Sequence, residues 1–145
     1  MTIKRNNFTR KIHRKLKWGV AGCGRFTELT FLPTFQQLKR SKLISVYSRK
    51  LSRAKIIADE FSAENSFNDF DAFLKSDFDV LFIGSENRDH YEQVIKAANA
   101  GKNIFCEKPL AMNSRQAEEM VRVCSENNVW LSVDYPHQFH PIAAK

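Results

Sequence analysis

The sequence predicts a doubly wound α/β fold, in which a parallel six-stranded sheet has helices on both faces. Six short apolar runs alternate with segments of helical periodicity, and no two consecutive runs have the spacing of a hairpin. A glycine-rich turn, Gly22-Cys23-Gly24, directly follows the first run. Strands separated by helices need right-handed crossovers, which place parallel strands side by side and a helix layer on each face.

Each strand is expected where apolar residues run together. The run from Val80 to Ile83 is apolar at every position, which is typical of a strand that is covered on both faces. The third strand should be very short, because a helical turn follows it within a few residues. In chain order, we expect strands at residues 17–22, 42–48, the start of 66–76, 79–84, 103–107 and 129–134.

The helices are expected where apolar residues recur every three or four positions. Pro33 should bend or divide the first helix, and Gly101 should end the fourth in the left-handed conformation. Asn113 and Gln116 have the spacing of a capping box at the start of the last helix. The second helix should bury one face, made of Leu51, Ala54, Ile57, Ala58 and Phe61. We expect helices at residues 25–40, 51–61, the second part of 66–76, 88–102 and 113–128.

The composition is that of one ordinary globular domain. The chain has 145 residues, of which 43% are hydrophobic, enough for a core of its own. No apolar stretch approaches the roughly 18 residues that a membrane span requires, and the N-terminus is polar, so we expect a cytoplasmic protein. The three cysteines are odd in number and form no C-x-x-C pair. They predict small core residues rather than disulfides or a metal site.

Residues 1–16 are expected to form a basic N-terminal arm ahead of a domain at residues 17–145. The first 17 residues hold 7 positive charges and no acid, which leaves 16 basic and 16 acidic residues in the remainder. Such a leader is most often a disordered tail. Phe8, Ile12 and Leu16 fall four apart, so a basic amphipathic helix on an anionic surface, nucleic acid or an import receptor stays open. Nucleic-acid binding finds no second supporting feature in the sequence.

The turn after the first strand is typical of a dinucleotide-binding site. Gly22 permits a tight turn, and Gly24 lets the backbone approach a pyrophosphate. Backbone amides at the start of the following helix, around Arg25 and Phe26, would offer hydrogen bonds and a positive dipole end to the phosphates. Thr27 stands where the fingerprint has Gly or Ala for close helix packing. A tight turn without a ligand is the alternative, but the position after strand one favours the nucleotide site.

The residues after the second strand favour NADP, with NAD as the other possibility. An NAD site needs an acid about 20 residues after the glycines, where it accepts from the ribose hydroxyls. The sequence has "SRKLSR" there, and Ser48, Arg49 and Arg53 are hydrogen-bond donors. Arg49 can hold a 2′-phosphate through its planar fork. A solvated basic patch is the alternative. Cations at a helix N-terminus oppose the helix dipole, and a bound anion would relieve that cost.

Three segments together resemble a known family. They are "KWGVAGCGRF", "SVYSRKLSRAKIIADEF" and "DVLFIGSENRDHYEQVIKAANAGKNIFCEKPLA". In this order they are similar to the N-terminal domain of the glucose-fructose oxidoreductase, inositol dehydrogenase and rhizopine catabolism (Gfo/Idh/MocA) family, over residues 17 to about 141. The resemblance implies a Rossmann fold, an NAD(P) cofactor and a secondary alcohol or carbonyl of a sugar, polyol or related small molecule as substrate.

The same resemblance implies a catalytic role for Lys108. In similar enzymes this lysine reaches the nicotinamide and the substrate, where an ammonium group can donate a hydrogen bond to a hydroxyl or carbonyl while hydride moves. We expect Lys108 to be partly buried. Glu107 would orient the site or contact the nicotinamide side. Pro109 restricts Lys108 to an extended backbone, with a trans or a cis bond between them.

Other residues are assigned by resemblance alone. Ser85, Asn87 and His90 match a segment that lines the cofactor in the family, while Glu86 replaces its usual proline. Gln138 stands where the family usually has an arginine near the end of strand six.

Two functions remain open. Members of the family continue into a second α/β domain that forms the substrate pocket, whereas this chain stops at Lys145. The chain would be an NAD(P)-dependent oxidoreductase or its cofactor-binding half, working as a homo-oligomer or with a separate C-terminal-domain chain. The alternative is a non-catalytic NAD(P)-binding regulatory or partner module. The Glu-Lys-Pro motif favours the first function, and the absent domain favours the second.

Overall fold

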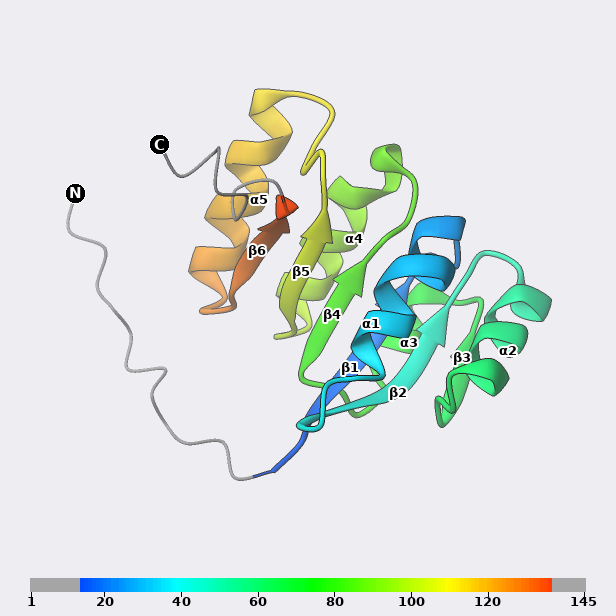
Figure 1. The fold of residues 1–145 in the computed structure, drawn as a ribbon. Helices are drawn as coiled ribbons and strands as arrows, with labels where there is room; N and C mark the ends of the chain where they lie inside the picture. Colours follow the sequence, from blue (N-terminus) through cyan, green and yellow to red (C-terminus); the bar gives the residue numbers. More distant parts are fainter. Residues whose placement is uncertain (1–13, 137–145) are drawn as a thin grey trace, which may run out of the picture.

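The computed structural model of the protein describes residues 14–136. Six parallel strands form one sheet in the order β3-β2-β1-β4-β5-β6 (Figure 1). The chain moves outward from β1 to β3, crosses back to β4 and moves outward again, which confirms the predicted doubly wound sheet. The strands are β1 (Leu16–Ala21), β2 (Ser41–Tyr47), β3 (Asn65–Phe67), β4 (Val80–Ile83), β5 (Asn103–Glu107) and β6 (Leu131–Asp134).

Helices cover both faces of the sheet and divide the core in two. One cluster of buried side chains lies between β1, β2 and the helices α1 and α2. The other lies between the sheet and α3, α4 and α5, on the opposite face (Figure 1). The helices are η1 (Thr27–Phe31), α1 (Leu32–Phe35), α2 (Leu51–Glu60), α3 (Phe70–Leu74), α4 (Asn87–Asn99) and α5 (Ser114–Glu126).

The first helix differs from the expected one in length and in winding. Helical residues run from Arg25 to Phe35 instead of 25–40, because Leu38 is half-exposed and the apolar periodicity beyond Phe35 has no core to enter. The middle of the helix is a π-helix, and Pro33 lies in the first turn of the α-helical part that follows, so the winding changes just before Pro33 without a break in the helix. Phe31 of the π-helix stacks on Phe82 of β4, with ring centroids 3.6 Å apart.

The remaining local predictions are confirmed with two exceptions, of which one is half of the capping box: the side chain of Gln116 accepts from the amide of Met112 at 3.1 Å and not from that of Asn113. Gly101 has φ +71° directly after α4, and the side chain of Asn113 accepts a hydrogen bond from the amide of Gln116 at 3.0 Å. All three cysteines are buried and free. Leu51 is the other exception: it is 36% exposed at the first residue of α2, while the other four apolar residues of that face are buried.

The predicted arm lies mostly outside the described residues. Residues 1–13 and Gln138 are not described, and the boundary of the arm stays a prediction. Arg14, which we placed in the arm, forms two hydrogen bonds of 2.6 Å with the carboxylate of Asp79 next to β4. Between residues 14 and 136, no helix has the length and apolar character needed to cross a membrane.

Candidate functional site

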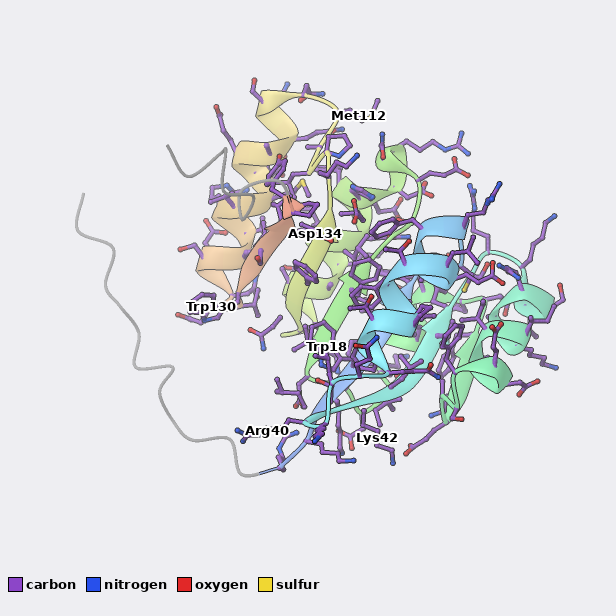
Figure 2. The ribbon with its side chains drawn as sticks, viewed as in Figure 1. Trp18, Arg40, Lys42, Met112, Trp130 and Asp134 are labelled. Carbon is purple, nitrogen blue, oxygen red and sulfur yellow. The ribbon has the colours of Figure 1, made fainter. Side chains whose placement is uncertain are left out.

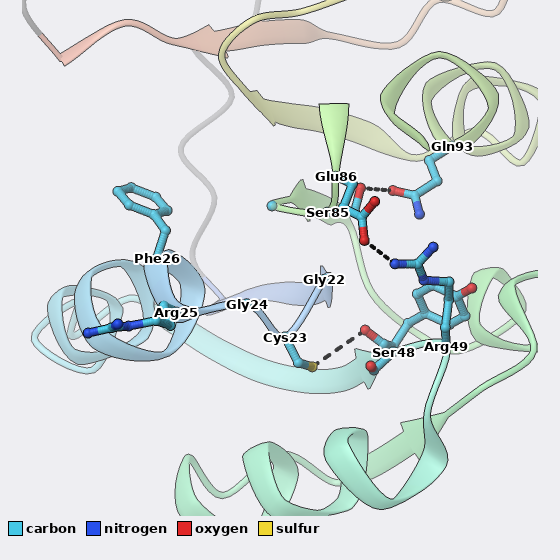
Figure 3. Close-up of a pocket in the computed structure, with 12 residues that line it drawn as sticks. Gly22, Cys23, Gly24, Arg25, Phe26, Ser48, Arg49, Ser85, Glu86 and Gln93 are labelled. Atoms are coloured by element: carbon cyan, nitrogen blue, oxygen red, sulfur yellow. Dashed lines mark hydrogen bonds and ion pairs between the residues drawn. The ribbon is translucent and has the colours of Figure 1, made fainter. Parts of the chain in front are cut away.

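A cleft lined by most of the predicted cofactor residues lies where the strand order reverses. β1 and β4 are neighbours in the sheet, but the chain passes from β1 toward β3 on one side and from β4 toward β6 on the other. The connections that leave the carboxyl ends of β1 and β4 therefore diverge, and a crevice opens between them. The backbone amide of Gly22 donates to the carbonyl of Tyr47 at 3.0 Å, and that of Gly84 donates to the carbonyl of Ala21 at 2.8 Å. The cleft has a volume of about 390 Å³ (Figure 3). It is lined by Gly22, Cys23, Gly24, Arg25, Phe26, Tyr47, Ser48, Arg49, Gly84, Ser85, Glu86 and Gln93.

The two glycines of the turn have different surroundings. Gly22 has φ +95°, and a Cβ there would lie 2.4 Å from the backbone nitrogen of Ser85, so both the conformation and the space require glycine. A Cβ on Gly24 would meet no protein atom within 4 Å. Gly24 therefore leaves space on the cleft side of the turn, which is a cradle of the kind that a pyrophosphate would fill.

Thr27 occupies the third fingerprint position with the help of Gly84. The Thr27 side chain is fully buried, and a Cβ on Gly84 would lie 2.6 Å from its hydroxyl oxygen. In the usual fingerprint a small residue at position 27 lets the helix pack closely against the sheet. Here Thr27 is larger, and the space for it comes from Gly84, which has no Cβ.

The first helix begins at the wall of the cleft. The amide of Glu28 donates to the carbonyl of Gly24 at 3.1 Å, which makes Gly24 the acceptor of the first helical hydrogen bond. The amides of the first helical residues have no acceptor within the helix and lie at its positive end. Arg25 and Phe26 line the cleft with exposed side chains (Figure 3). The turn and the helix start thus border the same space.

Ser48 and Arg49 line the cleft from the end of β2. No acid stands between Tyr47 and Lys50, so the ribose-binding carboxylate of an NAD site is absent from this loop. The guanidinium of Arg49 is paired with the carboxylate of Glu86 across the cleft (Figure 3). The hydrogen bond from Arg49 is the main cause of the lowered pKa of Glu86.

Arg53 does not line the cleft. Its Nε donates to the carbonyl of Cys23 at 3.1 Å, and its Nη2 donates to the carboxylate of Glu28 at 2.5 Å. These contacts use the guanidinium to connect α2 to the back of the glycine turn. Arg53 therefore supports the shape of the turn, whereas the sequence predicted direct cofactor contact.

Three residues after β4 were predicted to contact the cofactor, namely Ser85, Asn87 and His90, and only the first lines the cleft. Ser85 lines the cleft and donates to the side chain of Gln93 at 2.7 Å, while Asn87 is the first residue of α4 and is exposed outside the lining. His90 is fully buried, also outside the lining. Its Nδ1 lies 2.9 Å from the carbonyl oxygen of Pro109 and its Nε2 lies 3.2 Å from that of Ser85.

The Glu-Lys-Pro motif begins at the last residue of β5, at the carboxyl end of the sheet where the cleft also lies, one strand beyond β4. Neither Glu107 nor Lys108 is among the lining residues of the cleft. Lys108 is exposed, so the expectation of partial burial is wrong: β5 ends at Glu107, and Lys108 lies in the turn that follows the strand. The carboxylate of Glu107 accepts a hydrogen bond from the amide of Lys108 at 3.0 Å.

Glu107 faces a second carboxyl group. Asp134 is its register partner at the end of β6. Burial is the main cause that raises the pKa of Glu107, and the hydrogen bond and charge of Asp134 add to it, while the amide of Lys108 acts in the opposite direction. This pair was not predicted, because nothing in the separate sequences of two strands specifies their register.

Five lining residues were missed by the sequence analysis: Cys23, Tyr47, Gly84, Glu86 and Gln93. Cys23 donates to the carbonyl of Tyr47 at 3.6 Å, and burial raises the pKa of its thiol to about 11, so it is not a nucleophile at neutral pH. Gly84 and Glu86 lie within three residues of the end of β4. The rule that ligands of open parallel sheets bind outside the carboxyl ends of the strands could have identified both. Gln93 lies two turns into α4 and carries no such signal.

A second hollow, of about 570 Å³, lies at the opposite edge of the sheet. It is mainly apolar and is lined near the beginnings of β1, β4 and β5, with Trp18 and Trp130 (Figure 2). Ligands of open parallel sheets bind outside the carboxyl ends of the strands, so we assign the functional site to the cleft at the carboxyl ends of β1 and β4. Among the described residues, no three His, Cys, Asp or Glu side chains cluster as metal ligands.

Comparisons with known proteins agree with this geometry. Residues 16–135 match the model of the GFO_IDH_MocA oxidoreductase family, NAD-binding Rossmann fold. The scyllo-inositol 2-dehydrogenase (NADP(+)) IolU of Bacillus subtilis is 34% identical over 117 residues, which cover 80% of this chain and 35% of that protein. The trans-1,2-dihydrobenzene-1,2-diol dehydrogenase of Xenopus laevis is 30% identical over 132 residues, 87% of this chain and 39% of that protein.

Solved structures show the same relationship. The 3-ketoreductase KijD10 from Actinomadura kijaniata, in complex with TDP-benzene and NADP, superimposes with a TM-score of 0.84 at 26% identity, over 90% of this chain and 42% of that one. An oxidoreductase from Agrobacterium radiobacter, in complex with NAD+, L-tartaric acid and magnesium, gives a TM-score of 0.80 at 26% identity, over 86% and 36%. The chain thus spans well under half the length of these relatives. It belongs to the Gfo/Idh/MocA family of oxidoreductases and corresponds to their NAD-binding Rossmann fold.

Proposed function

We propose that the chain is the cofactor-binding half of an NAD(P)-dependent oxidoreductase, with NADP as the preferred cofactor. The cleft at the strand reversal is the observation that carries this proposal, because it brings the glycine turn, the start of the first helix and the end of β2 around one space. The pyrophosphate would lie against the backbone of Gly24 and the amides that open the helix. Both of these contacts are made by backbone groups and need no charged side chain.

The preference for NADP rests on Ser48 and Arg49. Both line the cleft at the end of β2, where a 2′-phosphate on the adenosine ribose would lie. An arginine fork and a hydroxyl suit a phosphate, and this loop contains no acid that would accept from a free 2′-hydroxyl. Relatives named or solved with NADP support the proposal, although one solved relative holds NAD+.

The reaction proposed is hydride transfer between the nicotinamide and a secondary alcohol or carbonyl of a sugar, a polyol or a related small molecule. The bound cofactor supplies the hydride chemistry. Lys108 would hold a hydrogen bond to the reacting oxygen and exchange a proton there, while Glu107 fixes the backbone of the lysine by accepting from its amide. The inositol dehydrogenase and the 3-ketoreductase among the relatives support this class of substrate.

A non-catalytic NAD(P)-binding module is the second candidate. The observation that favours it is the exposure of Lys108 outside the lining of the cleft. Both candidates require cofactor binding, and only the first requires turnover.

The test of the cofactor assignment is a fluorescence titration of the chain with NADPH and NADH. NADPH should bind more tightly, and Arg49→Ala should narrow the difference by weakening NADPH alone. Lys75→Ala is a matched control that removes a positive charge from a residue outside the cleft. Equal affinities for the two cofactors in wild type and in Arg49→Ala would reject the NADP preference.

A further inference from the structure

We propose that Glu86 is a specificity-determining residue of the cofactor site, because its carboxylate competes with a 2′-phosphate for the guanidinium of Arg49. This inference rests on the proposed function. It adds a residue, Glu86, that lowers the affinity of the site for NADP. Arg49 is the cation of the cleft best placed to select NADP, and an acid of the same cleft already engages it.

The geometry places the two side chains opposite each other. Arg49 leaves the connection after β2, and Glu86 precedes α4 in the connection after β4, so the pair spans the cleft between two neighbouring loops (Figure 3). Both side chains are more than half exposed, at 58% and 53%. The pair is therefore accessible to a ligand that enters the cleft.

The surroundings of the pair hold the carboxylate at this position. The second oxygen of Glu86 accepts from Arg88 at 2.7 Å, and Asp89 lies 3.9 Å from the other amino group of Arg49. The two arginines also lower the pKa of Glu86, with Arg49 as the larger cause, so the carboxylate is charged at neutral pH. A phosphate that binds Arg49 must therefore displace one acid and approach a second.

The opposite role for Glu86, as an acceptor for the ribose hydroxyls of NAD, is less consistent with these contacts. A ribose-binding acid stands at the end of the second strand, whereas Glu86 follows β4. Each of its oxygens also has an arginine partner already. A 2′-phosphate can replace the carboxylate on Arg49 with the same charge-assisted geometry, which makes exchange the simpler outcome.

The experiment compares wild type with Glu86→Gln by calorimetric titration with NADPH, NADH, 2′,5′-ADP and 5′-ADP. The amide keeps the size of the side chain and removes its charge. Exposed ion pairs are weak, so we expect NADPH and 2′,5′-ADP to bind about three- to fivefold more tightly to the variant, with NADH and 5′-ADP changed by less than about twofold. Glu92→Gln, the same charge change within α4 beside Lys96, is the control and should change none of the four affinities.

A second variant separates competition from simple charge repulsion. In an Arg49→Ala background no guanidinium is left to compete for, so Glu86→Gln should improve NADPH binding less than it does in wild type. An unchanged NADPH affinity in Glu86→Gln, or a weaker NADH affinity, would overturn the inference while leaving the cofactor site in place. Absence of binding of all four ligands to wild type would instead overturn the proposed function itself.

Discussion

The buried ring of His90 lies 2.9 Å from the carbonyl oxygen of Pro109, so α4 is joined directly to the Glu-Lys-Pro turn. The other ring nitrogen lies 3.2 Å from the carbonyl of Ser85, at the cofactor cleft. One side chain thus connects the two loops that carry the proposed cofactor and catalytic residues. The sequence assigned His90 to the lining of the cofactor pocket, whereas the structure places it in the protein interior behind that pocket.

Replacement of His90 should destabilise the fold. His90→Ala removes a fully buried ring and leaves buried carbonyl oxygens without their neighbour, so we expect a loss of about 2 to 4 kcal/mol in the free energy of unfolding. His90→Asn keeps one amide donor and should lose less. Urea denaturation followed by circular dichroism measures both. Arg88→Ala, an exposed position of the same helix, should have little effect, and a loss as large as that of His90→Ala would contradict this interpretation.

The glycine turn allows a matched pair of variants. Gly22→Ala should lower the free energy of unfolding by about 3 kcal/mol, because the new Cβ meets the backbone of Ser85 at a positive φ. Gly24→Ala should change it by less than about 0.5 kcal/mol, since its Cβ meets nothing. The same Cβ enters the proposed pyrophosphate site, so Gly24→Ala should still weaken NADPH binding. Wild-type affinity in Gly24→Ala would show that the phosphates lie elsewhere.

Glu107 should make stability depend on pH in a defined direction. Its pKa is raised in the folded protein, so the folded state keeps a proton that the unfolded state loses first as the pH rises. The resulting stabilisation is full below the unfolded pKa of about 4.3 and is lost as the pH rises through the folded value. Relative to wild type, Glu107→Gln should therefore become more stable as the pH increases from 4 to about 8. Denaturation curves at several pH values measure this difference, and a constant difference would contradict the raised pKa.

Lys108 distinguishes an enzyme from a binding module. The assay would combine the chain with a second polypeptide that corresponds to the part of the relatives that this chain does not cover. Lys108→Ala should then reduce turnover by about a hundredfold or more, because the proposed hydrogen bond to the reacting oxygen is lost. NADPH affinity should stay unchanged, since Lys108 does not line the cleft. Loss of cofactor binding together with turnover would indicate a structural role for the lysine.

The fold could be predicted because its signals are local. The apolar run before Gly84, the capping pair Asn113 and Gln116, and the left-handed Gly101 each depend on neighbours in the sequence. The parallel order then follows from the lack of hairpins. The π-helical turn before Pro33 could not be foreseen, since it depends on the stacking of Phe31 on a distant strand.

The candidate site was predicted in its position and less well in its contacts. The glycine turn after the first strand located the cleft, and Gly22, Gly24, Ser48 and Arg49 all line it. Side-chain direction was not predictable, because it depends on partners from other loops. Arg53 turns away to Glu28 and the glycine turn for this reason.

Cofactor binding by the folded chain underlies both the assignment of the cleft and the role proposed for Lys108. Isothermal titration calorimetry of wild type with NADPH should give saturable heat with one site per chain, and Gly24→Ala should weaken that binding without loss of folded structure. Folded wild-type protein that gives no saturable heat with NADPH or NADH would contradict the assignment of the cleft and, with it, the role proposed for Lys108.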